Sequence, residues 1–318
     1  MMRIVITEFM DEAAVATLKA RHDTLYDKDL VDRPAELLAE VAMATALIVR
    51  NRTQVNARLL AAAPLLRIVG RLGVGLDNID VQACLAREIE VIPATGANAL
   101  AVAEYVVASA MVLLRGAYAS TGVVAAGRWP RAALSNGREL GGKTLGIVGF
   151  GDIGRSVARL ARGVGMRVIG TDAQLPANAS VWADENVLPR DLDALLGEAD
   201  VVTLHVPLTA TTRNLIDAAR LTRFRRDAVL INTARGGVVD EPALAAALRG
   251  GSLGGAAMDV FADEPLAVGS PLEDCPNLIL TPHIAGLSLE SNTRVSGLIA
   301  DKVAVALAAL AKAQPCRA

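Results

Sequence analysis

A glycine-rich turn is the first feature of this sequence that could do chemistry. Gly149, Gly151 and Gly154 follow the apolar run 145–148 and open the helical stretch Arg155–Arg162. In a G-x-G-x-x-G turn the first glycine makes the tight turn, the second lets the backbone approach a pyrophosphate, and the third permits close helix–strand contact. The motif therefore indicates a dinucleotide site, and a glycine-rich connection without a ligand is the alternative.

A carboxylate at the end of the next apolar run favours the dinucleotide. Asp172 lies eighteen positions after Gly154, where it can accept hydrogen bonds from ribose hydroxyls. The helix N-terminus, with the amides of Asp152 and Ile153, supplies positive potential for the phosphates. Because a 2′-phosphate would be repelled by Asp172, we expect NAD rather than NADP. A solvated Asp at a strand end is the alternative.

These residues need a sheet to position them, and the sequence predicts an α/β fold. Short β-rich apolar runs alternate with Ala- and Leu-rich helical stretches, which favours parallel strands covered on both faces. In the first hundred residues the expected strands are Arg3–Thr7, Ala46–Arg50, Leu66–Gly70 and Glu90–Pro93, and the expected helices include Asp11–Arg21 and Asn56–Ala62. Six more strands are expected at Thr144–Val148, Arg167–Thr171, Val201–His205, Ala228–Asn232, Gly255–Val260 and Leu278–Leu280.

Two long helices complete the prediction. One helical stretch runs from Asn98 to about Ala126 and bridges the two series of strands. The other, from Leu289 to about Ala311, has an apolar face that needs a partner surface. A chain of 318 residues is long enough for about two compact units.

Composition narrows the classes of ligand and compartment. Hydrophobic residues make up 53% and charged residues 21%, which excludes a disordered chain. Lys and Arg number 32 against 34 Asp and Glu, so we expect no nucleic-acid or membrane partner and a small-molecule ligand instead.

Cysteine usage and the N-terminus favour a cytoplasmic protein without a metal site. Cys84, Cys275 and Cys316 form neither an even set nor a C-x-x-C pair, so a disulfide framework or zinc site is not expected. The N-terminal apolar run is too short for a signal peptide. Glu104 and Arg115 interrupt the apolar stretch 99–119, which favours a buried helix over a membrane span.

Several segments together resemble the D-isomer-specific 2-hydroxyacid dehydrogenase family, in order along nearly the whole chain. They are the glycine motif and the segments 73–80, 232–240, 258–265 and 281–286. The resemblance implies NAD-dependent hydride transfer between a D-configured 2-hydroxy acid and its 2-oxo acid. It further implies a Rossmann cofactor domain, residues 98–287, inserted into a flavodoxin-like substrate domain formed by residues 1–97 and 288–318. A homodimer is expected from the same resemblance.

The family's catalytic residues fall on Arg235, Glu264 and His283. A guanidinium can bind the carboxylate of a 2-oxo acid and polarise its carbonyl. An imidazole can exchange a proton with the substrate oxygen, and a carboxylate can orient the ring. The alternatives are a helix-capping Arg, a solvated Glu and a packed loop His.

The resemblance also implies further cofactor contacts. They are expected at His205, Val206, Pro207, Thr212, Thr233, Ala234, Asp259 and Gly286. For His205 a structural role is the alternative, because a strand-end His can satisfy a neighbouring group.

Substrate contacts are expected from the first series of strands. Backbone amides near Arg71, Gly73, Val74 and Gly75 can hold the substrate carboxylate. The cluster after another strand, Arg50, Asn51 and Arg52, indicates together with Arg71 a second anionic group on the substrate. A cluster of arginines that face solvent or structural carboxylates is the alternative.

The expected substrate is a three-carbon acid with a sulfonate or phosphate. The segment Ile284–Asn292 departs from the His-Ile-Gly-Ala-x-Thr pattern of phosphoglycerate enzymes, which favours (S)-sulfolactate over 3-phosphoglycerate. A glyoxylate/hydroxypyruvate reductase and an NAD(H)-sensing corepressor-like binding protein are the alternatives. Glu264 disfavours formate dehydrogenase, whose pattern has Gln there. Since the chain ends soon after its last helix, serine feedback through an added domain is not expected.

Overall fold

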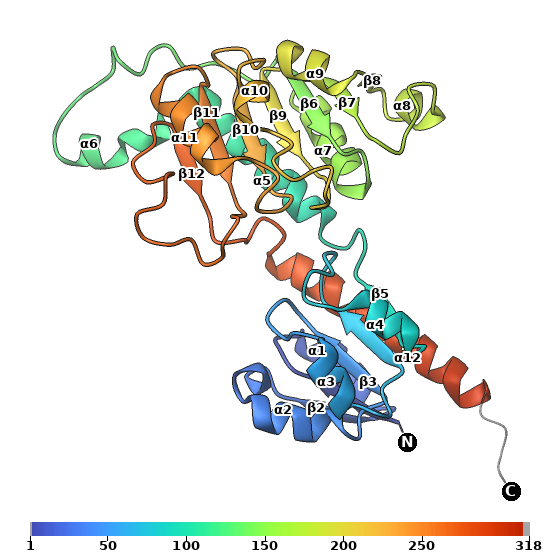
Figure 1. Cartoon of the computed structure of the whole chain (residues 1–318). Coiled ribbons are helices and arrows are strands. Elements are labelled where there is room, and N and C mark those ends of the chain that lie inside the picture. The colour runs from blue at the N-terminus through green and yellow to red at the C-terminus, as the bar shows by residue number, and fades with distance from the viewer. Residues whose placement is uncertain (1, 314–318) are drawn as a thin grey trace, which may run out of the picture. The chain divides into compact units, whose positions relative to one another are not determined.

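The computed structural model describes residues 2–313, so Cys316 lies outside the described residues. The chain divides into two compact units, shown in Figure 1: unit 1 comprises residues 1–98 and 287–318, and unit 2 comprises residues 99–286. Both are α/β units with parallel sheets, in agreement with the predicted fold class.

The sheet of unit 1 has five strands in the order β2-β1-β3-β4-β5. Their bounds are β1 Arg3–Ile6, β2 Asp23–Tyr26, β3 Ala46–Val49, β4 Ile68–Arg71 and β5 Glu90–Pro93. This is the flavodoxin-like order, in which ligands bind beyond the carboxyl ends of β1 and β3, where the strand order reverses. The sequence prediction missed β2, a half-buried edge strand with little apolar alternation.

Helices cover both faces of this sheet. They are α1 Glu12–Lys19, α2 Pro34–Val41, α3 Ala57–Ala62, α4 Val81–Ala86 and α12 Leu289–Ala313, with a 3-10 turn at Leu30–Asp32. Alternation along β1 sends Ile4 and Ile6 into the core under α1 and α12, and sends Val5 into the core under α2, α3 and α4. The apolar face predicted for the last helix therefore packs on this sheet. Gly70 makes this possible, because a Cβ there would lie 2.9 Å from Ile299 and 3.0 Å from Val303.

The sheet of unit 2 has seven strands in the order β12-β11-β10-β9-β6-β7-β8. Their bounds are β6 Thr144–Val148, β7 Arg167–Thr171, β8 Leu188–Pro189, β9 Val201–Leu204, β10 Val229–Asn232, β11 Gly255–Met258 and β12 Leu278–Leu280. This is a Rossmann arrangement, whose order reverses between β6 and β9. The two-residue β8 adds a strand to the six that the sequence predicts.

The helices of unit 2 form a layer on each face of the sheet (Figure 1). They are α5 Ala99–Arg115, α6 Thr121–Ala125, α7 Asp152–Gly163, α8 Ser180–Asp184, α9 Leu192–Glu198, α10 Ala218–Leu221 and α11 Glu241–Arg249, with a 3-10 turn at Tyr118–Ser120. α5 and α7 share one core with β6, and α9, α10 and α11 bury the other face. The apolar side chains of each layer are thus removed from water.

The single helix predicted from Asn98 to Ala126 is wrong. α5 ends at Arg115, and Gly116 follows in the left-handed region at φ +67°, which breaks the helix before α6. Within residues 2–313 no single helix is long and apolar enough to cross a membrane. Taken together, α5 and the segment Tyr118–Ala125 are long and apolar enough to do so, but the two are bent by 69° relative to each other.

Candidate active site

The loops of unit 2 that carry the candidate site residues all begin at the same edge of its sheet. Register pairing aligns the last residues of six strands across the sheet: Thr171, Val148, Leu204, Asn232, Met258 and Leu280. Since parallel strands end at the same edge, the glycine turn, Asp172, His205 and the loops carrying the three candidate catalytic residues all belong to that edge. The sequence placed the glycine turn, Asp172 and His205 at the ends of strands, and the structure aligns these ends with the strands that precede the three candidate catalytic residues.

The glycine turn has the geometry that a pyrophosphate requires. Gly149 has φ +94°, and a Cβ there would lie 2.4 Å from the backbone oxygen of His205. A Cβ on Gly154 would lie 2.3 Å from the Gly149 oxygen, so this glycine lets α7 approach β6. Over Gly151, by contrast, a Cβ would meet nothing within 4 Å. That open space adjoins the N-terminus of α7, where Gly151 provides no side-chain cap. The first amides of a helix without such a cap can bind an anionic ligand.

Asp172 is fixed by the turn that it follows. Its Oδ2 accepts a hydrogen bond from the Phe150 amide at 2.7 Å, and its Oδ1 accepts one from the Gln174 amide at 2.8 Å. Each carboxylate oxygen retains acceptor capacity. The charge is thus held beside the glycine turn, in the place where a ribose would follow the pyrophosphate.

Two buried polar atoms near this edge have no protein partner among the described residues. They are Nδ1 of His205 and Oγ1 of Thr233. The other ring nitrogen of His205 lies 3.0 Å from Oγ1 of Thr203, and burial lowers the pKa of His205 to about 3. His205 is therefore neutral at pH 7, consistent with the structural alternative. Buried polar atoms are normally paired, so these two atoms fit a site that receives a polar ligand such as NAD.

The other residues of the His205 loop bind one another. Oγ1 of Thr212 donates to the backbone oxygen of Pro207 at 2.6 Å and accepts from the Thr209 amide at 2.7 Å. Val206 contributes to the packing around Gly149, where its Cγ1 lies 3.0 Å from the position of an added Cβ. These contacts fix the loop beside the glycine turn.

The side chains of Glu264 and His283, on the loops after β11 and β12, lie within ion-pair distance of each other. Oε2 of Glu264 lies 2.8 Å from Nδ1 of His283, and Oε1 accepts a hydrogen bond from the Phe261 amide at 3.1 Å. The two side chains are 36% and 44% exposed, so Nε2 of the ring remains accessible to a substrate. A carboxylate on one ring nitrogen fixes the ring and leaves the other for proton exchange.

Arg235 lies on the loop after β10, which is shaped by two residues. Asn232 is buried, and its side chain donates to the Arg235 oxygen at 3.1 Å and accepts from the Ala234 amide at 3.0 Å. A Cβ on Gly236 would lie 1.7 Å from the Phe261 oxygen, so only glycine lets this loop contact the segment that precedes Glu264. Sequence reasoning quoted Asn232 within its motif but did not recognise this role.

Asp259 holds the loop that carries His283. Its Oδ1 accepts from Oγ1 of Thr281 at 2.6 Å and from the Ile284 amide at 2.9 Å, and its Oδ2 accepts from the Ala285 amide at 2.8 Å. The side chain is buried. The sequence predicted a cofactor contact for Asp259 and missed this positioning of the loop. Gly286 ends the same loop at the boundary of unit 2.

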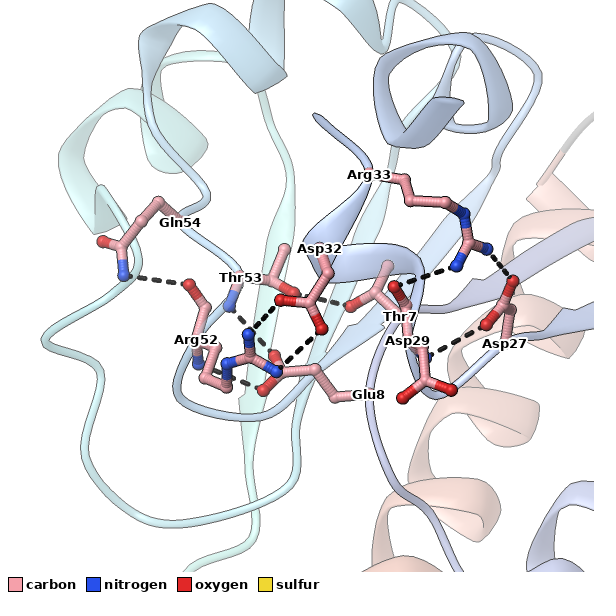
Figure 2. A network of polar contacts seen from close by, with 9 residues as sticks. All are labelled: Thr7, Glu8, Asp27, Asp29, Asp32, Arg33, Arg52, Thr53 and Gln54. Atoms are coloured by element: carbon pink, nitrogen blue, oxygen red, sulfur yellow. Dashed lines mark hydrogen bonds and ion pairs between the residues drawn. The ribbon is translucent and has the colours of Figure 1, made fainter. Parts of the chain in front are cut away.

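In unit 1 a buried carboxylate builds the loop after β3. Glu8 is 4% exposed, and it accepts hydrogen bonds from the amides of Arg50, Arg52 and Thr53 at 2.9, 3.1 and 3.0 Å. Figure 2 shows two of these contacts, those to Arg52 and Thr53. Sequence reasoning missed Glu8, although it lies just beyond β1, opposite the end of β3. The loop is therefore fixed at the point where the strand order of unit 1 reverses.

The two arginines of this loop have different partners. Both terminal nitrogens of Arg52 bind the carboxylate of Asp32, and its side chain is 57% exposed (Figure 2). Arg50 instead donates to Oδ1 of Asn292 at 2.7 Å and lies over the ring of Phe9, with 5.8 Å to its centroid. Burial lowers the pKa of Arg50. Arg52 thus matches the alternative of an arginine held by a structural carboxylate, while Arg50 does not.

The remaining substrate candidates lie near the end of β4. The Arg71 guanidinium lies over Gly73, where a Cβ would approach its Nη1 to 2.2 Å. The Gly73 oxygen accepts from the Ala94 amide at 2.9 Å, and Val74 is exposed. Asn51 is exposed between the two arginines. In residues 2–313 no group of three or more His, Cys, Asp or Glu side chains could hold a metal ion.

Comparison with known proteins gives the class of this fold and site. The family model "D-isomer specific 2-hydroxyacid dehydrogenase, NAD binding domain" matches residues 107–285. The chain belongs to this family, and its cofactor is NAD. The protein is accordingly an NAD-dependent dehydrogenase that acts on a small 2-hydroxy or 2-oxo acid.

Two curated relatives differ in how much of their length the chain spans. The chain is 53% identical to the (S)-sulfolactate dehydrogenase of Chromohalobacter salexigens over 304 residues, covering 96% of this chain and 98% of the relative. It is 39% identical to the D-3-phosphoglycerate dehydrogenase of Mycobacterium tuberculosis over 310 residues, covering 96% of this chain and 58% of that protein.

Solved structures show the same fold. A protein from Thermus thermophilus superimposes with a TM-score of 0.87 at 34% identity over 97% of each chain. A glyoxylate reductase from Paecilomyes thermophila does so with a TM-score of 0.85 at 27% identity over 96% of this chain and 95% of its own.

Proposed function

We propose that the protein interconverts (S)-sulfolactate and sulfopyruvate. The observation that carries this proposal is Arg50, a guanidinium at the strand-order reversal of unit 1 that makes no ion pair with a described residue. Its charge is available to a second anionic group on the substrate. The similarity to an (S)-sulfolactate dehydrogenase over 98% of that protein's length supports a sulfonate as this group. A D-configured sulfolactate carries the label S, because sulfur raises the priority of its carbon above that of the carboxyl group.

The roles of the three candidate catalytic residues follow from their chemistry. Arg235 binds the carboxylate of the oxo acid with two parallel hydrogen bonds and polarises the carbonyl. His283 donates a proton from Nε2 to the substrate oxygen during reduction, and it removes the hydroxyl proton during oxidation. Glu264 holds Nδ1 of the ring and compensates its charge. NAD held at the glycine turn and Asp172 would supply the acceptor for the hydride that leaves C2 of the hydroxy acid, and NADH would supply the donor in the reverse direction.

The cofactor contacts are proposed for the residues around the glycine turn. Gly149, Gly151, Gly154 and the first amides of α7 hold the pyrophosphate, and Asp172 holds the ribose. His205 and Thr233 offer their unpartnered polar atoms to the same ligand. Unit 2 is thereby the cofactor domain.

A screen of 2-oxo acids with NADH tests the substrate. We expect kcat/KM to be highest for sulfopyruvate, lower for phosphohydroxypyruvate, and at least about tenfold lower for the uncharged side chains of hydroxypyruvate and glyoxylate, because a charge-assisted hydrogen bond is lost. A preference for phosphohydroxypyruvate would assign the protein to 3-phosphoglycerate instead. A preference for glyoxylate or hydroxypyruvate that persists in Arg50→Gln would overturn the second anionic group.

We also propose a cytoplasmic homodimer. In unit 2, α6 and the loop that follows it reach beyond the sheet (Figure 1). Trp129 in this loop and Tyr118 in the 3-10 turn before α6 are 77% and 64% exposed. Large apolar side chains gathered on one exposed segment indicate an interface. Sedimentation over a range of concentrations tests this, and a monomer at every concentration contradicts it.

A further inference from the structure

A line of three polar side chains joins α5 to the loop that carries His283. The hydroxyl of Tyr105 lies 2.6 Å from Oγ1 of Thr281, which in turn lies 2.6 Å from Oδ1 of Asp259. Tyr105 is 176 residues away from Thr281 in the sequence, and none of the motifs contains it. We infer that Tyr105 is a positioning residue for His283, acting through Thr281 and Asp259. This inference rests on the proposed role of His283 in proton transfer.

The direction of the hydrogen bonds follows from the donors available. An ionised Asp259 can only accept, so the single hydroxyl hydrogen of Thr281 goes to its carboxylate. Thr281 therefore has only lone pairs left for Tyr105, and the phenol must donate. Burial and the nearby charge of Asp259 raise the pKa of Tyr105, which keeps the phenol in its donating form.

Asp259 passes this constraint to the His283 loop through the backbone. Its carboxylate accepts the amides of Ile284 and Ala285, and its own backbone oxygen accepts the His283 amide at 2.8 Å. These contacts hold a costly conformation, because His283 has φ +55°, in the left-handed region that non-glycine residues rarely adopt. A loop in such a conformation needs fixed partners on both sides if its imidazole is to stay on Glu264.

The other end of the line is rigid. Val102, Ala103 and Val106 flank Tyr105 on α5 and are buried in the core that α5 shares with α7 and β6. These buried neighbours fix the position of Tyr105, so its hydroxyl offers Thr281 a hydrogen-bond partner at a fixed place. Removal of the phenol oxygen should leave the packing of α5 unchanged, and it breaks the contact to Thr281 together with a contact to Ser109 on the same helix.

The test compares kcat and KM for variants that remove one hydroxyl each. In Tyr105→Phe and in Thr281→Val we expect kcat to fall about threefold to tenfold, the effect of one hydrogen bond, with KM for NADH changed by less than about twofold. Thr281→Ser keeps the hydroxyl and should restore kcat. Thr17→Val is the matched control for Thr281→Val, since among the described residues the Thr17 hydroxyl binds only the Ala13 oxygen within α1, and it should match the wild type.

A double variant shows whether the effect passes through His283. If Tyr105 only positions the imidazole, Tyr105→Phe should lower kcat no further in a His283→Ala background. In the single variant, amide exchange should rise in the peptide 281–286 while the melting temperature stays close to that of the wild type. Additive losses, a rise in KM for NADH with kcat unchanged, or an unchanged kcat in Tyr105→Phe would overturn the inference. An unaltered kcat in His283→Ala would instead reject the proposed role of His283 itself.

Discussion

The guanidinium of Arg50 donates a hydrogen bond to the side-chain oxygen of Asn292 across 2.7 Å, which links the loop after β3 to the first turns of α12. Glu8 holds the amide of Arg50, and the side chain of Asn78 donates to its backbone oxygen at 3.1 Å. Both the backbone and the charged group of Arg50 are therefore fixed before any substrate arrives. Preorganisation of this kind lowers the entropic cost of binding an anion.

We predict that Arg50 and Asn292 govern the preference for an anionic side chain. Arg50→Gln should lower kcat/KM for sulfopyruvate by about tenfold to a hundredfold, because a charge-assisted contact is lost. Asn292→Ala should lower it by about threefold to tenfold, because Arg50 keeps its charge but loses its orientation. Steady-state kinetics with sulfopyruvate and glyoxylate measure both effects, and glyoxylate, which lacks a side chain, should be affected far less.

Arg52→Gln is the matched control for this prediction. It removes an arginine from the same loop, but this arginine is bound by Asp32 and exposed, and its exposed ion pair contributes little to stability. We expect kcat/KM for sulfopyruvate to stay within about twofold of the wild type. A loss as large as that of Arg50→Gln would show that the cluster acts as a whole.

Asp172 should determine the choice of cofactor. With its carboxylate held between the amides of Phe150 and Gln174, it cannot move away from a 2′-phosphate. We expect kcat/KM with NADH to exceed that with NADPH by at least about a hundredfold. Asp172→Ser should lower the ratio of kcat/KM with NADH to that with NADPH. NADH loses a hydrogen-bond acceptor for its ribose, and the 2′-phosphate of NADPH no longer meets a negative charge. Equal efficiency of the wild type with both cofactors would refute the assignment.

The charge of Glu264, rather than its shape, should matter for turnover. Glu264→Gln keeps a side chain of similar size beside His283 but removes the negative charge that compensates the imidazolium. We expect kcat to fall by about tenfold to a hundredfold, with KM for the oxo acid changed much less. Glu273→Gln, a glutamate of the same unit outside this pair, serves as the control and should leave kcat unchanged. If both variants matched the wild type, Glu264 would have no part in the reaction.

Residues that follow strands could be placed from the sequence, because parallel strands end at a common edge. Asp172 was found in this way, directly after β7, whereas Arg235 and His283, three residues beyond β10 and β12, were assigned through the resemblance to the family. The sequence could not show that Arg52 is bound by a carboxylate while Arg50 is not. This difference depends on Asp32, which a 3-10 turn after β2 brings to Arg52, and the sequence prediction had missed β2.

Contacts between residues that are far apart in the sequence could not be predicted either. Tyr105 lies in the middle of an apolar helix, where an aromatic residue predicts core packing, and only the folded sheet places it beside Thr281. The break at Gly116 was missed for a related reason, since one glycine within an Ala-rich stretch is compatible with a continuous helix. For Tyr105 the local pattern was correct and only the tertiary partner was missing, whereas at Gly116 the local pattern allowed both a continuous and a broken helix.

The last prediction concerns stability in acid. Burial lowers the pKa of His205 from 6.5 to about 3, so between these values the unfolded chain binds a proton that the folded chain does not. The free energy of unfolding should therefore fall as the pH drops below about 6.5, with a contribution from His205 of at most about 1.4 kcal/mol per pH unit. His205→Gln has no titrating ring and should lose this contribution. Urea unfolding of both proteins from pH 7 to pH 4 measures it. His22→Gln is the comparison, since burial lowers the pKa of His22 less, and it should lose a smaller contribution of the same sign. Parallel curves for the wild type and His205→Gln would mean that the ring is protonated in the folded state.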